Sequence, residues 1–164
     1  MKEIEAKVRI KKEDINRIRR YLDAHYQFID KVKKTDYYFE AGKRYTIRLR
    51  ITKNGNIITL KKKKIGEGIE ENSELEWAVK DASKWMKENK LKPKWTKKKK
   101  SEKYKGGGGV ILELNDVKYL GTFLEIEGES KKQIIQTFQR FGYSKKDFVM
   151  HYYLELLKDK ARYA

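Results

Sequence analysis

The stretch EIEAKVRI, residues 3–10, alternates charged and apolar residues without interruption. Because successive side chains of a β-strand point to opposite faces, the pattern predicts a strand with one apolar and one charged face. The charged face carries Glu3, Glu5, Lys7 and Arg9. Paired carboxylates are hard oxygen ligands that suit Mg²⁺ or Mn²⁺, whereas lysine and arginine suit phosphate. The face is therefore either a solvated outer surface or half of a site for a metal ion and phosphate groups.

The same alternation recurs in other strand-like runs, and their charges are sorted by sign. Glutamates mark the first, middle and last of these runs, and basic residues mark the runs between them. The residues on these faces are Arg48 and Arg50, Thr59, Lys61 and Lys63, Glu74 and Glu76, Lys97 and Lys99, and Glu125, Glu127 and Glu129. For any one strand, a solvated outer face is the simpler explanation. If the faces instead line a closed barrel, the barrel must hold water and counter-ions, because unpaired buried charges are prohibitive.

The composition limits the classes of function. The formal net charge of +17 favours nucleic acid if the charge lies on an outer face, and a polyphosphate if it converges on an interior. Cysteine is absent and only two histidines occur, which argues against thiol chemistry and a histidine-built metal site. No apolar run reaches the roughly 18 residues of a membrane span, so we expect a soluble, cytoplasmic protein with no membrane partner.

Many short strands and few helices must position the charged faces. Strands are predicted at 2–10, 27–32, 35–40, 45–51, 57–63, 73–79, 94–105, 110–115 and 122–129, helices at 11–26 and 131–141, and loops at 65–72 and 106–109. Asn54-Gly55 predicts a hairpin turn, and Asp81 predicts the cap of a helix that carries Trp85. This pattern predicts an α+β protein, mainly antiparallel β, closed or nearly closed as a barrel. The length of 164 residues predicts one domain, 1–164.

Seven motifs follow one another in a recognisable order. They are EIEAK (3–7), TDYYF (35–39), TIRLR (46–50), TLKKK (59–63), SELEW (73–77), VKYLGTFLEIE (117–127) and HYYLELL (151–157). Together they resemble the ExExK signature and the later motifs of the CYTH superfamily, the triphosphate tunnel metalloenzymes. The correspondence covers nearly the whole chain. The resemblance implies an eight-stranded closed antiparallel β-barrel that encloses a triphosphate tunnel and has flanking helices.

The resemblance also implies roles for particular residues. Metal ligands fall on Glu3, Glu5, Glu125 and Glu127, with Glu74 and Glu76 as further acidic groups near the metal. Phosphate-binding cations fall on Lys7, Arg48, Arg50, Lys61 and Lys99. The implied catalytic residues are Glu5, Glu127 and Lys7. The implied cofactor is Mg²⁺ or Mn²⁺.

Some positions depart from the family pattern. Asn115 stands where an aspartate is usual, so one metal contact or the water-orienting group lacks a charge. Ser101 stands where an arginine is usual, and a neighbouring lysine must then supply that charge. The arginine often found before the E-x-E strand is replaced by Asn72 or Ser73. We expect these departures to alter substrate choice or to weaken activity.

Three functions remain open on the sequence alone. The first is metal-dependent hydrolysis of an inorganic, thiamine or nucleoside triphosphate. The second is that of a class IV adenylate cyclase, which converts ATP to cyclic AMP and pyrophosphate in a similar tunnel. The third is non-catalytic binding of polyphosphate or nucleic acid. For the first two we expect a small-molecule triphosphate as substrate, nonspecific nucleic-acid binding at most, and a monomer or homodimer.

Overall fold

The computed structural model describes residues 1–39 and 45–162. The strands are β1 (Lys2–Ile10), β2 (Gln27–Phe39), β3 (Tyr45–Thr52), β4 (Gly55–Lys62), β5 (Ile65–Gly66), β6 (Ile69–Val79), β7 (Trp95–Lys105), β8 (Ile111–Val117) and β9 (Gly121–Gly128). The helices are α1 (Ile15–His25), α2 (Ala82–Glu88), α3 (Lys131–Arg140) and α4 (Tyr153–Arg162), with 3₁₀ turns η1 (Lys12–Asp14), η2 (Gly107–Gly109) and η3 (Lys145–Asp147). Within these described ranges, no helix is long and apolar enough to cross a membrane.

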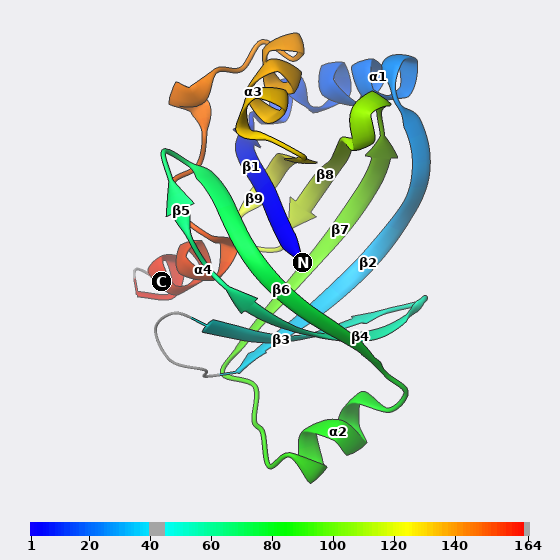
Figure 1. Ribbon diagram of the computed structural model, residues 1–164, viewed down its shortest axis with the longest axis vertical. Coiled ribbons are helices and arrows are strands. Elements are labelled where there is room, and N and C mark those ends of the chain that lie inside the picture. Colours follow the sequence, from blue (N-terminus) through cyan, green and yellow to red (C-terminus); the bar gives the residue numbers. More distant parts are fainter. Residues whose placement is uncertain (40–44, 163–164) are drawn as a thin grey trace.

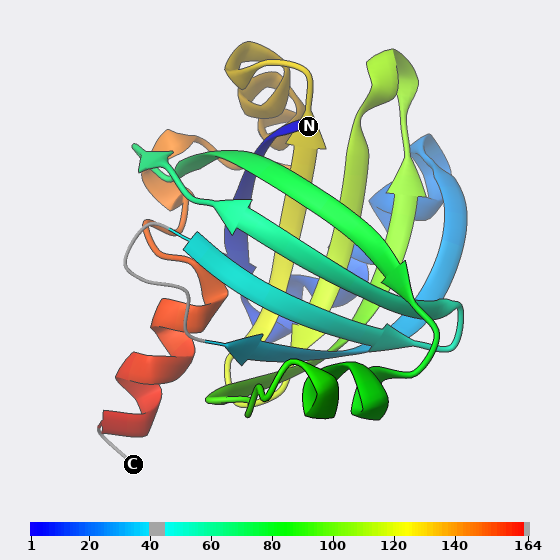
Figure 2. The same ribbon diagram turned by 60° about the horizontal axis from the view of Figure 1, so that its bottom comes forward.

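The strands form one antiparallel sheet that closes on itself (Figures 1 and 2). Hydrogen-bonded neighbours follow the order β1-β9-β8-β7-β2-β3-β4-β6, and β6 pairs back with β1. The closing register places Glu3 opposite Asn72 and Glu5 opposite Glu70. The described residues thus form a closed barrel of eight strands, to which the short β5 adds at the edge of β6. The predicted α+β barrel with flanking helices is confirmed.

The apolar faces of the strands point outward, and helices cover a large part of them. Leu22 of α1 and Phe138 of α3 belong to the same buried cluster as Leu124 of β9. At the opposite end of the molecule in Figure 1, α2 lies against a second cluster that contains Leu49 of β3 and Ile58 of β4. Because side chains alternate along a strand, outward apolar faces place the charged faces inside the barrel.

One strand is longer than the sequence pattern suggested. The runs 27–32 and 35–40 belong to a single strand, β2, with one shift in register near its start. Lys33 and Lys34 do not end the strand, because they continue its inward and outward alternation and pair across to β7. Residue 40, the predicted end of the second run, lies outside the described residues.

The predicted loop at 65–72 also contains strand structure. It holds β5 and the first residues of β6, joined by a tight turn in which Glu67 and Gly68 have φ values of 54° and 78°. The glycine is suited to this left-handed conformation, and glutamate adopts it less readily. The early start of β6 brings Glu70 and Asn72 into the barrel wall, where both are buried.

The local signals for turns and caps are confirmed. Thr52 and Gly55 pair across the predicted Asn54-Gly55 hairpin. The Asp81 side chain accepts a 2.9 Å hydrogen bond from the backbone N–H of Lys84, which caps α2. These contacts fix the connections between β3 and β4 and between β6 and α2.

Burial predicts where a truncated side chain destabilises the barrel. Leu124 is fully buried, whereas Leu75 exposes 63% of its surface. Leu124→Ala should lower the free energy of unfolding by about 2–5 kcal/mol, because it leaves a cavity in the core. Leu75→Ala should change it by less than about 0.5 kcal/mol. Urea denaturation followed by circular dichroism measures both values, and equal losses would contradict this packing.

Candidate functional site

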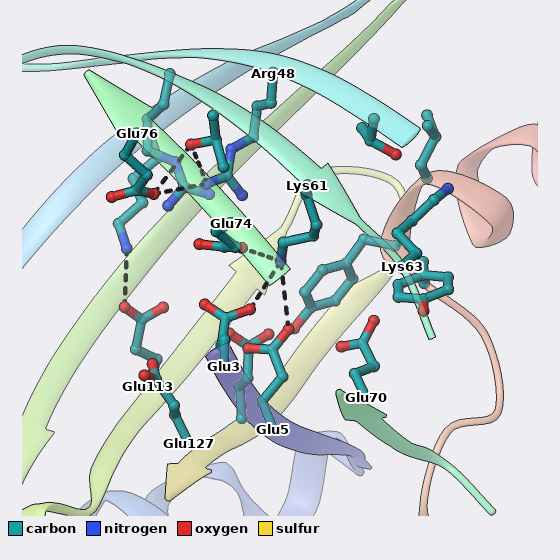
Figure 3. Close-up of a pocket in the computed structure, with 18 of the residues that line it drawn as sticks. Glu3, Glu5, Arg48, Lys61, Lys63, Glu70, Glu74, Glu76, Glu113 and Glu127 are labelled. Carbon is teal, nitrogen blue, oxygen red and sulfur yellow. Dashed lines mark hydrogen bonds and ion pairs between the residues drawn. The ribbon is translucent and has the colours of Figure 1, made fainter. Parts of the chain in front are cut away.

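A charged cavity of about 360 Å³ lies inside the barrel (Figure 3). Small-molecule sites typically have volumes of roughly 300–1,000 Å³. In the part of the chain that the structure describes, eight glutamates and seven basic side chains line the cavity. They are Glu3, Glu5, Glu70, Glu74, Glu76, Glu113, Glu125 and Glu127, and Lys34, Arg48, Arg50, Lys61, Lys63, Lys99 and Lys103. These charges nearly balance, so the net charge of +17 lies mainly outside the cavity.

Lys61 of β4 lies at the centre of the acidic side of the cavity (Figure 3). Its Nζ is 2.9 Å from a carboxylate oxygen of Glu3 and 2.7 Å from one of Glu74. A carboxylate oxygen of Glu5 is 3.9 Å away. Lys61 and Glu74 are direct cross-strand partners, so the register of β4 and β6 fixes this pair. Although burial disfavours the ammonium charge, Glu5 and Glu3 hold the pKa of Lys61 above its usual value.

A second group of carboxylates extends from β9. Glu125 lies opposite Lys7 of β1, and Glu127 lies opposite Glu5. Burial raises the pKa of Glu127 to about 7, and the carboxylates of Glu3 and Glu5 add to this shift. Burial, followed by repulsion from Glu5, also raises the pKa of Glu125. Crowded, partly buried carboxylates of this kind are stabilised by an added cation.

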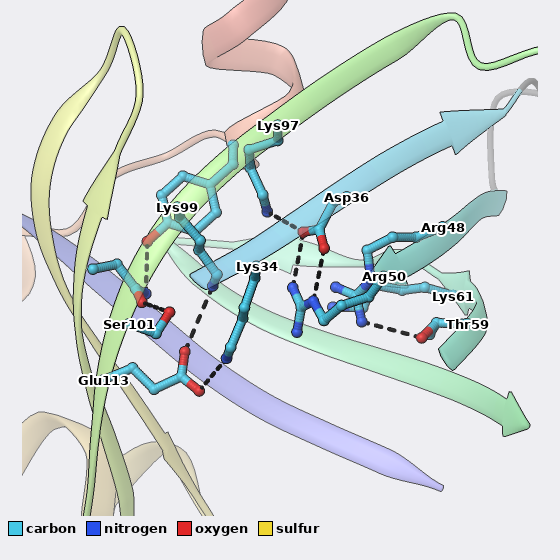
Figure 4. A network of polar contacts seen from close by, with 12 residues as sticks. Lys34, Asp36, Arg48, Arg50, Thr59, Lys61, Lys97, Lys99, Ser101 and Glu113 are labelled. Carbon is cyan, nitrogen blue, oxygen red and sulfur yellow. Dashed lines mark hydrogen bonds and ion pairs between the residues drawn. The ribbon is translucent and has the colours of Figure 1, made fainter. Parts of the chain in front are cut away.

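The opposite wall is basic, and a buried aspartate organises one part of it (Figure 4). Arg50 donates two hydrogen bonds to the carboxylate of Asp36, at 2.7 and 2.9 Å. The Nζ of Lys97 lies 3.1 Å from the same carboxylate. Burial alone would raise the pKa of Asp36, but Arg50 and Lys97 hold it well below its usual range. The guanidinium of Arg50 is therefore fixed in orientation at the cavity wall.

Glu113 organises a second part of the basic wall. Its carboxylate lies 2.9 Å from the Nζ of Lys34 and 3.5 Å from the Nζ of Lys99. Burial and repulsion by Lys99 lower the pKa of Lys34 to about 8. Burial opposes the charge of Glu113, yet Lys99 and Lys34 hold its pKa below the usual value. One carboxylate thus holds two ammonium groups at the cavity surface.

The Arg48 side chain is held at the cavity wall by a hydrogen bond, whereas the Lys7 side chain is buried behind that wall. The Nη2 of Arg48 donates a 3.1 Å hydrogen bond to the hydroxyl of Thr59 at the cavity wall. Lys7 is only 2% exposed, and its Nζ lies 3.7 Å from an oxygen of Glu70 and 4.8 Å from the ring centroid of Tyr153. Lys7 is therefore inside the barrel but beyond the wall of the cavity.

The structure brings together the residues that the sequence predicted. Of the eleven predicted metal- or phosphate-binding residues, ten line the cavity, and Lys7 lies just behind its wall. Glu76 lies at the edge, with 38% of its side chain exposed. Arg9 was expected to point inward with the rest of the charged face of β1, but it is exposed. Its guanidinium lies 4.6 Å from the ring centroid of Phe123.

Other charged residues at the cavity were not predicted. They are Lys34, Glu70, Lys103 and Glu113. Strand alternation was the signal that would have found three of them, because Glu113 is in phase with Asn115, Lys34 with Asp36 and Lys103 with Lys99. Glu70 was missed because its segment was predicted as a loop.

The acidic side of the cavity fits a hard metal ion in its chemistry. All of its donors are carboxylate oxygens, which Mg²⁺ and Mn²⁺ prefer. Burial and, after it, repulsion between carboxylates raise the pKa values of Glu125 and Glu127, and a divalent ion would relieve that repulsion. Among residues 1–39 and 45–162, no three acidic or histidine side chains are already close enough to form a metal site.

The fold and the cavity define a class of protein. It is a closed antiparallel barrel whose charged strand faces point inward, with carboxylates on one wall and cations on the other. The family model for the CYTH domain matches residues 1–153, and the chain belongs to this family. The resemblance seen in the seven sequence motifs is thus confirmed. A comparison with curated proteins found no match.

Solved structures share the fold over nearly the whole chain. The PH1012 protein from Pyrococcus horikoshii OT3 is 32% identical, with coverage of 94% of this chain and 98% of that one and a TM-score of 0.81. A conserved hypothetical protein from Pyrococcus furiosus is 30% identical, with coverage of 94% and 99% and a TM-score of 0.81. HpAC1 from Hippeastrum, described as having a dominant triphosphatase activity, is 16% identical, covers 96% of each chain and has a TM-score of 0.75. At that identity, the likeness to HpAC1 shows the fold alone.

The buried lysine beside Asp36 predicts a dependence of stability on pH. Burial lowers the pKa of Lys97 from 10.5 to about 8, although Asp36 opposes the shift. Between these two values the unfolded chain binds more protons at this site, so stability rises with pH. From pH 8 to 10.5, the parent should gain up to about 3 kcal/mol relative to Lys97→Met. Urea denaturation of both proteins across this range measures the difference, and a constant difference would contradict the assignment.

Proposed function

We propose that the protein hydrolyses a triphosphate in a reaction that depends on a divalent metal ion. The observation that carries this proposal is the division of the cavity into two walls. Carboxylates that suit a divalent ion face guanidinium and ammonium groups that suit phosphate, within about 360 Å³. A metal-bound triphosphate combines these two charge patterns in one small molecule, so it is the ligand that both walls can satisfy together.

The basic wall would bind the phosphate oxygens. The proposed phosphate-binding residues are Arg48, Arg50 and Lys99, together with Lys61 at the centre of the acidic side and Lys7 just behind the cavity wall. Arg50 is best prepared for this role, because its two hydrogen bonds to Asp36 already fix the guanidinium. A fixed guanidinium loses less side-chain entropy when a phosphate binds. Lys61 would exchange part of its carboxylate contacts for contacts with phosphate.

The acidic wall would hold the metal ion. The proposed ligands are Glu3, Glu5, Glu125 and Glu127, with Glu74 and Glu76 nearby. When bound, Mg²⁺ or Mn²⁺ neutralises charge on phosphoryl oxygens and makes a bound water more acidic. Glu127, one of these proposed ligands, also belongs to the proposed catalytic set. Glu5 and Lys7 complete the proposed catalytic set.

The lining of the cavity favours the phosphate chain over a nucleobase as the recognised group. Its fifteen charged side chains outnumber its aliphatic and aromatic residues, which in the described chain are Met1, Ile111, Leu154, Tyr38, Tyr152 and Tyr153. A base-binding pocket is predominantly apolar or aromatic, whereas this cavity offers charge on nearly every side. Inorganic triphosphate is therefore the simplest substrate, and cyclisation of ATP is the competing outcome.

The activity can be tested with purified protein, Mg²⁺ or Mn²⁺, and either tripolyphosphate or ATP. Release of orthophosphate supports the proposal. Cyclic AMP would instead indicate a cyclase, and the absence of any product would indicate a non-catalytic binder.

Glu5→Gln and Glu127→Gln should abolish turnover while the fold survives, because each removes a negative charge from the acidic wall. Glu129→Gln is the control, since this exposed glutamate does not line the cavity. Near-normal Mn²⁺-dependent turnover in both cavity variants would refute the assignment.

Lys7 provides a test of phosphate binding that does not require turnover. Removing its charge should weaken binding of tripolyphosphate by about 1.5–3 kcal/mol, as expected for a lost charge-assisted contact. Melting curves of Lys7→Met and the parent, with and without tripolyphosphate, measure this loss as a smaller ligand-induced stabilisation. Lys98→Met is the control, because Lys98 is exposed on the outer face of β7. Equal stabilisation of the parent and Lys7→Met would place Lys7 outside the binding site.

A further inference from the structure

Exposed lysines gather on the outer face of β2 and β7, which run side by side between α1 and α2 (Figure 1). Lys33 of β2 and Lys100 of β7 are direct cross-strand partners, and Lys98 lies two residues from Lys100 along β7. The backbone N–H of Lys118 donates a 2.9 Å hydrogen bond to the carbonyl of Lys98, which places the turn between β8 and β9 beside them. All four side chains are exposed, and together they form a basic face.

The charges of the basic face are not balanced by the protein. In the described part of the chain, none of its lysines makes an ion pair, not even Lys100 with Asp116, its direct cross-strand partner. The nearby Lys31, by contrast, pairs with Glu102. Like charges directly opposite on neighbouring strands destabilise a sheet. The pair formed by Lys33 and Lys100 is therefore unfavourable when the surface is free, and an anion that binds there would offset the repulsion.

An exposed aromatic ring borders the basic face. Tyr119 follows Lys118 in the turn between β8 and β9, and 68% of its surface is exposed. The Nζ of Lys118 lies 5.2 Å from the centroid of the ring. The φ of Tyr119 is 72°, a left-handed conformation that asparagine adopts more readily than tyrosine. The turn therefore presents a large aromatic ring to solvent at a position that local backbone preferences do not favour.

We propose that the basic face and Tyr119 together bind single-stranded nucleic acid. Lysine ammonium groups suit the phosphates of the backbone, and an exposed aromatic ring can stack on an unpaired base. Bases inside a duplex are already stacked on one another, which favours a single strand as the partner. The binding should tolerate many sequences, because every base has a face that can stack. It uses the outside of the barrel, so it is independent of the proposed hydrolysis in the cavity.

The excess charge of the whole surface provides an alternative explanation. With a net charge of +17, the protein could attract any polyanion without a particular site. In that case, neutralising any two exposed lysines would weaken binding equally, and Tyr119 would contribute nothing. A specific site instead makes the lysines of β7 matter more than lysines elsewhere. An acidic polypeptide, which also carries many negative charges, would need the lysines but not the ring.

The first test measures binding of fluorescently labelled oligothymidylate to the full chain by anisotropy at several salt concentrations. Each phosphate contact contributes about −0.7 to the slope of log K against log salt for a single strand. Lys98→Gln/Lys100→Gln should therefore make the slope less steep by about 1.4 and weaken binding roughly tenfold. Lys132→Gln/Lys146→Gln is the matched control, because it removes the same charge from exposed positions in α3 and η3. This control should leave the slope nearly unchanged.

The second test removes the stacking contact with Tyr119→Asn. Because asparagine suits the left-handed backbone, the turn should keep its shape while the ring is lost. Binding of oligothymidylate should weaken roughly 5–150-fold, whereas binding of double-stranded DNA should change less than about twofold. Arg48→Gln is the control for the cavity, since it removes a cation that lines the cavity and should leave oligothymidylate binding unchanged. Circular dichroism checks that each variant keeps its fold.

Several results would overturn the inference. Equal losses in the β7 variant and in its control would assign the binding to net charge alone. An unchanged affinity in Tyr119→Asn would leave a surface that an acidic polypeptide fits as well. A loss of affinity in Arg48→Gln would place the nucleic acid in the cavity. A parent protein that does not bind oligothymidylate at about 0.15 M salt would also contradict the inference, whether or not the protein hydrolyses a triphosphate.

Discussion

The structure depends on one electrostatic requirement, which is that charges enclosed by a barrel must be paired or hydrated. Strand register meets much of this requirement. Asp36 lies directly opposite Arg50 on one neighbouring strand and opposite Lys97 on the other, and Lys61 lies opposite Glu74. Each of these cross-strand neighbours is also an ion pair. A slip of one residue would turn every charged side chain outward and every apolar one inward, so the interior charges are matched to a single register.

The outer face of the sheet carries the apolar core, so the inner face is free to carry charged residues. The buried apolar clusters lie outside the barrel, beneath α1, α3 and α2, and stabilise the fold without using the cavity. Neighbouring interior residues can therefore be replaced together without disturbing the apolar core. Ser101 and Asn115 stand where the family resemblance implies an arginine and an aspartate, and they lie opposite each other. Both charges are absent together, and a buried hydrogen bond joins the two strands at that point.

Alternation in the sequence predicted the strands, their charged faces and a closed or nearly closed barrel, because period-two patterns report directly on the faces of a strand. It left open whether Glu3 and Glu5 point inward, and the family resemblance implied the tunnel that they line. Alternation did not predict the features that depend on distant parts of the chain. Arg9 is exposed although it continues the same face. The burial of Lys7 depends on Tyr153, which only the docking of α4 brings against it. Glu70 entered the wall through a tight turn that a local pattern of glycine and charge had marked as a loop.

The closure of the barrel between β1 and its two neighbours has a consequence for synthesis of the protein. Strand β1 leaves the ribosome before either of its partners and pairs with residues as distant as 73 and 128, so it waits without partners until those residues are made. Such non-local pairing slows folding and leaves strand edges open to other molecules. The charges on β1 discourage wrong pairing during that interval, as charged residues do on exposed edge strands. The glutamates and the lysine of the proposed site would thus act as gatekeepers against aggregation before they act on a ligand.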